Sequence, residues 1–409
     1  MKPIGTNRLS FSWVVVLLGA LLLFSANAYT YTFGVFFKPI AENFGWSRAA
    51  MSGAYAIRSL VCAAFAVPMG YWADRYGPRR VLLFCFILLG VGMIAIAKIT
   101  TLWQLYLIQG AGIGIGMSGT FVCIMSTVAK WHYAKRGLAL GIASAGTGLS
   151  SVIFPIVAAQ LIQAADWQFA IFIIGVIILV IGVPASLIMK DPPDVINRPL
   201  PGGTRTTRGP LHAWGLIPQF LKAPAFLAII IMFVLIGIVG NMLINHLVNY
   251  ATDIGITALV AAGMMSAMGV ASTIGRLGMG AVSDRIGTRR DTALCCLFMA
   301  VSYLLLISQI PALMWASAVV FGIGFGGVVP LVPALMGERV NIEQLSTATG
   351  VGTMGIFIGA ALGPWLGGFI FDVSGSYLWA LVLSAGASIA ALIITLRLPS
   401  ARLEIPQNK

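Results

Sequence analysis

The chain consists of long apolar runs separated by short turns that contain charged residues, proline or glycine. An α-helix needs about 20 mostly apolar residues to cross the hydrocarbon core of a bilayer, and each run reaches roughly that length. The pattern therefore predicts an all-α membrane protein with twelve transmembrane helices. These helices are expected over residues 11–37, 48–73, 81–100, 103–129, 137–163, 168–189, 223–249, 258–282, 291–309, 312–336, 346–371 and 377–398.

One longer polar segment follows the sixth predicted helix. It covers residues 190–222 and is basic and rich in proline and glycine, which is the composition of a loop. The segment divides the chain into an N-terminal six-helix bundle (1–189), a cytoplasmic central loop and a C-terminal six-helix bundle (223–409).

The two predicted bundles carry related sequences. PMGYWADRYGPRR at residues 68–80 matches GMGAVSDRIGTRR at residues 278–290, and GIGIG at 112–116 matches GIGFG at 322–326 with the same spacing. Internal repeats of this kind are typical of transporters built from two related bundles, with the substrate bound between them near the middle of the membrane. We therefore expect two pseudo-symmetric six-helix bundles.

The distribution of charge gives this arrangement an orientation. Charged residues make up 9% of the chain, against about 25% in soluble domains, and the formal net charge is +13. Of the 25 basic residues, 20 fall at the two termini or in the turns on the same side of the membrane. The positive-inside rule places that side, and both termini, in the cytoplasm. Topology accounts for the excess positive charge, so we expect no nucleic-acid partner.

Few residues suit catalytic or metal chemistry. All five cysteines lie inside apolar runs, where we expect them to be small buried hydrophobes. The chain has three histidines and no CxxC or HExxH pattern. A membrane-embedded enzyme would need His, Asp or Glu clustered at one depth, and the sequence contains no such cluster. We expect no enzyme, no catalytic residue, no metal site and no cofactor. A receptor or channel would not explain the duplicated sequence.

The predicted helix 258–282 contains one full charge, Arg276. Arg276 lies eight residues before the turn residue Asp284, or about 12 Å along a helix axis. A charge at such depth costs at least about 2.5–3.5 kcal/mol and usually faces a cavity or a partner. All twelve acids lie in loops or at helix ends, so Arg276 is expected to bind an anion that arrives and leaves. Its planar guanidinium matches a carboxylate. The alternative is a structural arginine that donates to backbone carbonyls.

Other polar residues in the predicted spans are weaker candidates. Arg58 is expected to be either a second cation near the substrate or a structural residue held by helix-end dipoles. His246 belongs to the residue type that changes charge near neutral pH, but a packed boundary histidine is nearly as good an interpretation. The candidate substrate-binding residues are Arg276, Tyr31, His246, Asn245, Asn27, Ser272, Arg58, Phe325 and Leu331.

The candidates other than the charged groups each have a structural alternative. Asn27 and Tyr31 share a helix face at i, i+4, and so do Asn241, Asn245 and Asn249. Such polar stripes line a transport path or join helices through hydrogen bonds. For Phe325 and Leu331, both in the predicted helix 312–336, packing in the protein core is the more ordinary role.

The pattern G-x-x-x-D-R-x-G-x-R-R occurs twice, in the turns after the second and eighth predicted helices. Its glycine allows two helices to approach closely, and its aspartate and arginines can pair at the cytoplasmic surface. We expect a conformational latch that forms and breaks during transport, although a plain basic loop is the alternative. The predicted latch residues are Gly70, Asp74, Arg75, Arg79, Gly280, Asp284, Arg285 and Arg289. At this motif the sequence resembles the major facilitator superfamily.

Further motifs resemble the monocarboxylate transporter family, including its bacterial oxalate/formate antiporter-like branch. They are GVFFKPI (34–40), KWHYAKRGLALGIASAGTG (130–148), Ile-Gly-Arg at 274–276 and GAALGPWLGG (359–368). The resemblance implies that Arg276 holds the substrate carboxylate. Ser272 stands where animal members have an aspartate, and Tyr31 where they have a lysine. The oxalate-exchanging relative uses a lysine in the eleventh helix, and residues 346–371 contain none.

Together these features predict a secondary transporter of small organic anions that works by alternating access. We expect proton-coupled transport of lactate- or pyruvate-like monocarboxylates, with His246 as the candidate proton carrier. The alternative is a dicarboxylate antiporter in which Arg58 and Arg276 each bind a carboxylate, and a multidrug exporter is less favoured because no acid is embedded. The expected partners are a small carboxylate, a proton and the lipid bilayer. We expect a functional monomer in the plasma membrane, the inner membrane for a bacterial source.

Overall fold

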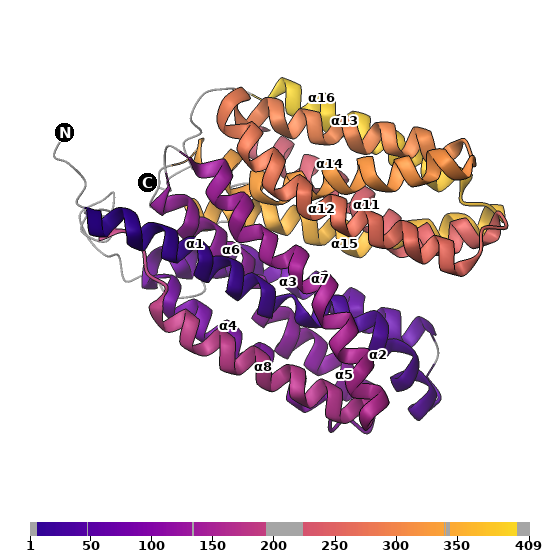
Figure 1. The fold of residues 1–409 in the computed structure, drawn as a ribbon, viewed down its shortest axis with the longest axis horizontal. Helices are drawn as coiled ribbons and strands as arrows, with labels where there is room; N and C mark the ends of the chain where they lie inside the picture. The colour runs from indigo at the N-terminus through magenta and orange to yellow at the C-terminus, as the bar shows by residue number, and fades with distance from the viewer. Residues whose placement is uncertain are drawn as a thin grey trace. The chain divides into compact units, whose positions relative to one another are not determined.

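The computed structural model describes residues 6–46, 48–132, 135–193, 224–338, 340 and 344–398. Across these residues the secondary structure is helical, and no β-strand occurs in them (Figure 1). Most of the expected central loop lies outside the described residues, since only residues 190–193 of it are described.

The helices form two compact units. Unit 1 contains Met1–Tyr133, Ile142–Gly215 and Asn341–Gly350, and unit 2 contains Ala134–Gly141, Leu216–Val340 and Val351–Lys409. Each unit thus includes the first turns of a helix whose remainder belongs to the other unit. These two divided helices are α7 (Arg136–Ala164) and α15 (Leu345–Ser374).

Unit 1 is built from the first part of the chain. Its helices are α1 (Thr6–Ala26), α2 (Ala28–Phe44), α3 (Arg48–Tyr76), α4 (Pro78–Ile96), α5 (Leu102–Leu107), η1 (Ile108–Gly114), α6 (Ile115–Trp131), most of α7 and α8 (Trp167–Ile188). α4 packs against α6 and α8, while α3 packs against η1 and α6. Phe86 and Gly182 show how closely α4 and α8 approach, because a Cβ atom on Gly182 would lie 2.1 Å from the Phe86 ring.

Two predicted helices of unit 1 are interrupted. The predicted helix 11–37 is divided at Asn27 into α1 and α2, although Phe11–Phe37 is still long and apolar enough to cross a membrane as one span. The predicted helix 103–129 contains η1, a seven-residue π-helix. π-helical turns inside α-helices are rare and occur frequently at functional sites. The completely buried Gln109 lies in this turn.

Unit 2 is built from the second part of the chain. Its helices are α11 (Pro224–Asp253), α12 (Ala258–Ile286), α13 (Thr288–Ile307), α14 (Pro311–Gly337), most of α15 and α16 (Leu378–Arg397). α13 packs against α14 and α16 (Figure 1). α12 packs against α14 through glycine: a Cβ atom on Gly326 would lie 2.2 Å from the Ser272 carbonyl oxygen, and one on Gly275 would lie 2.3 Å from that of Ile323. Only glycine permits this approach, which fixes α12 on α14.

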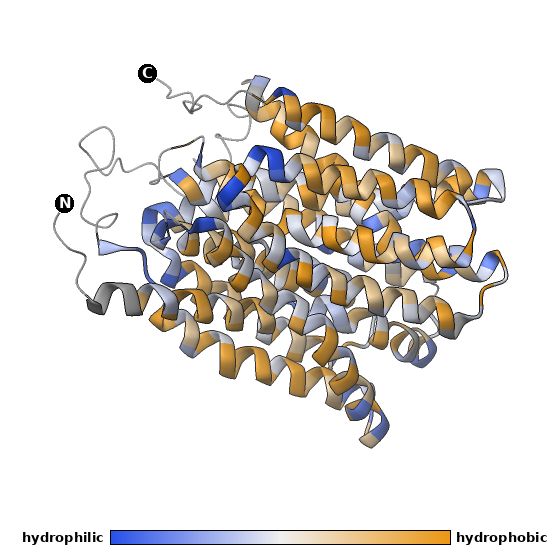
Figure 2. Ribbon diagram, turned by 45° about the horizontal axis from the view of Figure 1, so that its top comes forward, coloured by the Kyte–Doolittle hydropathy of each residue, from blue (hydrophilic) through white to orange (hydrophobic). Residues whose placement is uncertain are grey.

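The surface and the helix lengths suit a bilayer. Eleven helical spans in the described part of the chain are long and apolar enough to cross a membrane. Hydrophobic residues dominate most helices, and polar residues are found mainly near helix ends (Figure 2). Leu17, Val180 and Trp379 are more than 60% exposed, which suits side chains that face lipid.

Candidate functional site

Arg276 lies in α12 and is only 4% exposed. Its Nη1 donates a hydrogen bond of 2.7 Å to the Ser272 hydroxyl one helical turn earlier. Residues at i and i+4 lie on the same face of a helix, so the sequence spacing itself brings the two side chains together. Serine is a neutral hydrogen-bond acceptor, and this bond helps to orient the guanidinium.

The backbone at Arg276 is packed against the start of α7, whose residues up to Gly141 belong to unit 2. A Cβ atom on Gly141 would lie 2.6 Å from the Arg276 carbonyl oxygen, and one on Gly280 would lie 2.5 Å from that of Gly137. α12 is therefore in close backbone contact with two helices, α7 and α14. This packing holds the backbone of Arg276 in a fixed position.

Arg58 is the second buried guanidinium, at 3% exposure on α3 in unit 1. Its Nη1 donates to the Thr30 hydroxyl at 3.2 Å and lies 3.6 Å from the Met117 sulfur. Its guanidinium carbon lies 4.0 Å from the centre of the Tyr55 ring and 5.9 Å from that of Tyr29, so both rings provide cation–π contacts. Arg58 makes no ion pair with a described residue, and its Nε has no hydrogen-bond partner.

Gln109 and Tyr29 extend the surroundings of Arg58. The Gln109 amide nitrogen donates to the Tyr29 hydroxyl, and its amide oxygen is buried without a partner. The sequence interpretation did not select Gln109, Tyr29 or Tyr55. A single amide inside an otherwise apolar run beside GAGIGIG was the available signal for Gln109. Tyr29 reaches Arg58 through the packing of α2 on α3, whereas Tyr55 precedes Arg58 by three residues on α3, a spacing that puts both on one helix face.

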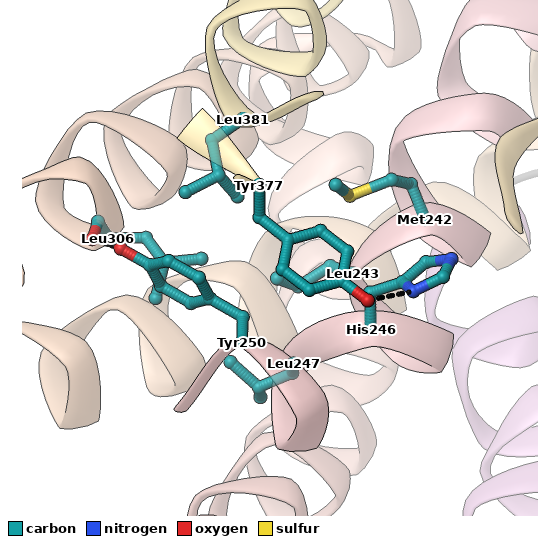
Figure 3. Close-up of a pocket in the computed structure, with 8 residues that line it drawn as sticks. All are labelled: Met242, Leu243, His246, Leu247, Tyr250, Leu306, Tyr377 and Leu381. Atoms are coloured by element: carbon teal, nitrogen blue, oxygen red, sulfur yellow. Dashed lines mark hydrogen bonds between the residues drawn. The ribbon is translucent and has the colours of Figure 1, made fainter. Parts of the chain in front are cut away.

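His246 lies in α11, and Figure 3 shows its hydrogen bond to Tyr377. Its Nε2 donates to the Pro364 carbonyl at 2.9 Å, and its Nδ1 forms a hydrogen bond of 3.1 Å with the Tyr377 hydroxyl. Burial raises the pKa of the Tyr377 hydroxyl. The side chains around this pair leave no space for a water molecule. Both ring nitrogens of His246 therefore have hydrogen-bond partners.

The remaining predicted substrate residues have various partners. Asn27 donates to the Leu23 carbonyl at 2.9 Å and to the Thr147 hydroxyl at 3.4 Å, and the exposed Asn245 donates to the Asn241 carbonyl at 2.7 Å. Tyr31 is half-buried on α2.

The two α14 candidates pack within unit 2. Phe325 stacks on Phe321 with ring centres 5.6 Å apart and covers Gly240 of α11, and Leu331 is completely buried. Of the predicted substrate residues, the structure therefore joins Ser272 to Arg276 by a direct hydrogen bond.

The first copy of the repeated motif holds the start of α15, which belongs to unit 1. The Asp74 carboxylate accepts from the Ser346 and Thr347 backbone N–H groups at 3.1 and 2.8 Å and from the Thr347 hydroxyl at 2.8 Å. It also forms an ion pair with Lys130 at 3.1 Å, and Lys130 pairs with Asp191 at 3.3 Å. A Cβ atom on Gly70 would lie 2.2 Å from the Ser346 carbonyl oxygen, so the motif glycine is required for this contact.

The second copy holds the start of α7, which belongs to unit 2. The Asp284 carboxylate accepts from the Gly137 and Leu138 backbone N–H groups at 2.8 and 3.0 Å. A carboxylate at a helix N-terminus satisfies free N–H groups and interacts favourably with the helix dipole. Both copies therefore place an aspartate on the first turn of another helix.

The arginines of the motif have other roles than the predicted pairing with these aspartates. Arg75 donates to the Tyr71 hydroxyl at 3.1 Å, and Arg289 donates to the Thr395 carbonyl at 3.2 Å. Arg79 and Arg285 are exposed. The lysine that pairs with Asp74 comes from α6, at a position that the motif does not include.

Most of the chain matches a known family. The sequence profile described as "Major Facilitator Superfamily" matches residues 16–301 and 250–409. The chain belongs to this superfamily. It is therefore a multi-pass membrane transporter and not an enzyme, as the sequence predicted.

Several curated proteins are distantly similar over most of the chain. "MFS-type transporter 1" of Ophiocordyceps sp. is 28% identical over 90% of this chain and 80% of its own length. "Monocarboxylate transporter 13" of Rattus norvegicus is 26% identical over 95% of this chain and 89% of its own. "Uncharacterized MFS-type transporter YhjX" of Escherichia coli is 24% identical over 85% of each. The relatives thus include monocarboxylate transporters without assigning the chain to a branch.

A solved structure supports the fold. The human organic anion transporter MFSD10 (TETRAN) matches with a TM-score of 0.70 over 96% of this chain and all of that chain, at 13% sequence identity. At this identity the match concerns the fold alone. The prediction of an all-helical membrane protein with the major facilitator fold is confirmed.

Proposed function

We propose that this protein is a proton-coupled transporter of small monocarboxylates such as lactate or pyruvate, acting by alternating access. The observation that carries the proposal is Arg276, a guanidinium buried in α12 and oriented by the neutral Ser272 hydroxyl. A guanidinium binds a carboxylate with two parallel hydrogen bonds, and burial strengthens this interaction. The similarity to monocarboxylate transporters over nearly the whole chain supports the same substrate class.

Uptake by purified protein in liposomes tests the role of Arg276. Arg276→Gln should lose nearly all uptake of labelled lactate and pyruvate, and Arg276→Lys should restore little because lysine lacks the planar fork. Arg397→Gln is the matched control, since Arg397 is an exposed arginine at the end of α16. Uptake at the wild-type rate by a folded Arg276→Gln variant would remove this residue from the site and the proposal with it.

A proton is the proposed coupling ion because a carboxylate that enters alone against a negative interior costs about 2.3 kcal/mol per 100 mV. His246 is the proposed carrier. Its Nδ1 takes up a proton when the Tyr377 hydroxyl turns from donor to acceptor, while Nε2 keeps its bond to the Pro364 carbonyl. An external pH lower than the internal pH should then accelerate lactate uptake. His246→Ala should reduce this dependence of the uptake rate on external pH.

The coupling test separates three outcomes. Loss of pH dependence in His246→Ala with retained lactate exchange supports the histidine as carrier. Full pH-driven accumulation by this variant rules the histidine out. Wild-type uptake that ignores a proton gradient would replace symport by exchange.

The repeated motif supplies the conformational element of the proposal. Asp74 and Asp284 each hold the first turn of a long helix, and we propose that these contacts open and close during the transport cycle. We further propose that residues 1–189 and 223–409 are the two bundles, that both termini are cytoplasmic, and that the protein works as a monomer in the plasma membrane.

A second candidate function is the exchange of short dicarboxylates. The observation that favours it is Arg58, a second buried guanidinium without an ion pair among the described residues. Rapid exchange of external oxalate for internal formate, combined with slow net lactate uptake, would favour this antiport over the monocarboxylate proposal.

A further inference from the structure

Two buried polar atoms near Tyr29 have no partner in the described structure. They are Nε of Arg58 and the amide oxygen of Gln109, on residues that are 3% and 0% exposed. Nearly all buried polar groups in proteins form hydrogen bonds, because leaving one unsatisfied is energetically costly. Two such atoms beside the same tyrosine indicate a group that the protein itself does not provide.

Both residues contact Tyr29. The Gln109 amide bonds to the Tyr29 hydroxyl, and the guanidinium carbon of Arg58 lies 5.9 Å from the centre of the same ring. The elements that bring them together are α2, α3 and the π-helix η1, all within unit 1. The π-helical turn places the amide at this position instead of leaving it in a regular α-helix.

The charge at this position is positive. Arg58 makes no ion pair with any described residue, and it contacts hydroxyl, thioether and aromatic groups. Asp74 and Asp191 of unit 1 both form ion pairs with Lys130. The Asp166 carboxylate accepts from the Phe169 N–H at the start of α8. A buried cation without a counter-ion is costly, so the expected ligand is an anion.

The Gln109 amide imposes a second requirement on the ligand. In the orientation found, Gln109 presents its oxygen, which needs a hydrogen-bond donor. Turning the amide over would exchange its ends and present the NH₂ group, which needs an acceptor. A hydroxyl group satisfies either end, because it donates and accepts. The ligand therefore carries an anionic acceptor for Arg58 and a hydroxyl for Gln109.

We propose that Arg58, Gln109, Tyr29 and Tyr55 form a binding site within unit 1 for a small 2-hydroxy monocarboxylate. The carboxylate accepts from Nε of Arg58, and the hydroxyl at C2 bonds to the Gln109 amide. The choice of a carboxylate as the anion rests on the proposed function, whereas the site itself is independent of Arg276. The site distinguishes hydroxy acids from unsubstituted acids such as acetate.

Isothermal titration calorimetry of the purified full-length protein in detergent, with sodium glycolate and sodium acetate as probes, tests the site. In the Arg276→Gln background, which removes the proposed unit 2 ligand, glycolate should still bind and should bind about tenfold tighter than acetate, as one good hydrogen bond provides. Gln109→Leu should remove this tenfold preference while acetate binding is unchanged. Arg58→Gln should abolish the binding of both acids.

Two further variants keep the test decisive if Arg58→Gln fails to fold. Gln109→Glu places a carboxylate beside Arg58 and should raise the unfolding temperature while abolishing glycolate binding, a result that a merely structural amide does not predict. Gln160→Leu, at an exposed position of α7 in unit 1, is the matched control and should bind like the parent protein.

The outcomes separate this inference from the proposed function. If wild-type protein transports lactate but Arg276→Gln abolishes all glycolate binding, the unit 1 site is refuted and the proposed function stands. If Arg276→Gln transports normally while Arg58 and Gln109 control glycolate binding, the site stands and the role of Arg276 falls. Equal binding of glycolate, acetate and chloride, or a preference unchanged by Gln109→Leu, also overturns the hydroxy-acid assignment.

Discussion

The two copies of the repeated motif bind helix starts in the same way but differ in their electrostatic setting. Asp74 and Asp284 each accept two backbone N–H groups, from the first turns of α15 and α7 respectively. Asp74 is half-buried and also pairs with Lys130, which in turn pairs with the buried Asp191. Asp284 is exposed and has no ion pair among the described residues.

This difference separates the contact with a helix start, which both copies of the motif make, from the ion pair, which depends on the residues around the first copy. In both copies, the aspartate accepts from the first turn of another helix and the preceding glycine allows that helix to approach closely. Among the described residues, a lysine adds a charge network in unit 1 only. We therefore expect the unit 1 contact to be the more stable one and the unit 2 contact to open more easily.

The largest effect is expected for Lys130→Met. This change leaves Asp74 and Asp191 without their shared cation, and removing one partner of a buried pair costs about 3–5 kcal/mol. The unfolding temperature of the purified protein should fall strongly. Lys135→Met, at an exposed lysine just before α7, is the control and should have little effect. A small change for Lys130→Met would show that the charge network contributes no net stability.

The two aspartates provide the second test. Asp74→Asn should destabilise by about 2 kcal/mol, because it loses a charge-assisted contact to Lys130 as well as the interaction with the helix start. Asp284→Asn should cost about 1 kcal/mol, the usual value for a helix N-terminal contact. Unfolding temperatures in the same detergent compare them directly. Equal losses would mean that only the helix contact matters in both copies.

Thr347 sharpens the comparison by a smaller amount. Its hydroxyl gives Asp74 a bond at 2.8 Å that Asp284 lacks in unit 2, where Gly137 and Leu138 provide backbone groups only. Thr347→Val keeps the shape and removes this bond, so we expect a loss of about 1 kcal/mol. A change within error would leave the backbone N–H groups as the important donors. Ser374→Ala, near the exposed end of α15, controls for a lost hydroxyl.

The sequence predicted the features that depend on local spacing. Apolar runs predicted the helices, because crossing a bilayer requires a fixed length of apolar chain. The i, i+4 spacing of Ser272 and Arg276 similarly determines their contact. Lys130, by contrast, lies 56 residues from Asp74 in sequence, and local reasoning paired that aspartate with the motif's arginines instead. The long-range partner is set by packing between helices.

The surroundings of Arg58 could not be predicted for the same reason. Thr30 and Tyr29 come from α2, and they face Arg58 only because of how α2 packs against α3. The π-helical turn that positions Gln109 has no reliable sequence signature, since its extra residue is stabilised by the packing around it. The division of the first span at Asn27 is likewise a tertiary effect, because Asn27 bonds both to the Leu23 carbonyl and to Thr147 of α7.

The smallest effect is expected for Asp191→Asn, and it appears mainly as a change in pH dependence. Burial raises the pKa of the Asp191 carboxyl above its ordinary value, although Lys130 opposes this shift. The folded state therefore holds this proton more tightly than the unfolded state does. This contribution to stability is fully present below the ordinary aspartate pKa of about 4 and is lost as the pH rises through the folded value.

The asparagine in Asp191→Asn is neutral at every pH. The variant should therefore lose this part of the dependence of stability on pH, with little change in unfolding temperature near pH 7. Thermal unfolding of both proteins between about pH 4 and 7, with the exposed Asp166→Asn as control, provides the measurement. A wild-type stability that rises over this interval relative to Asp191→Asn would show instead that the ion pair with Lys130 outweighs burial, and that all three charges of the unit 1 network are stabilising.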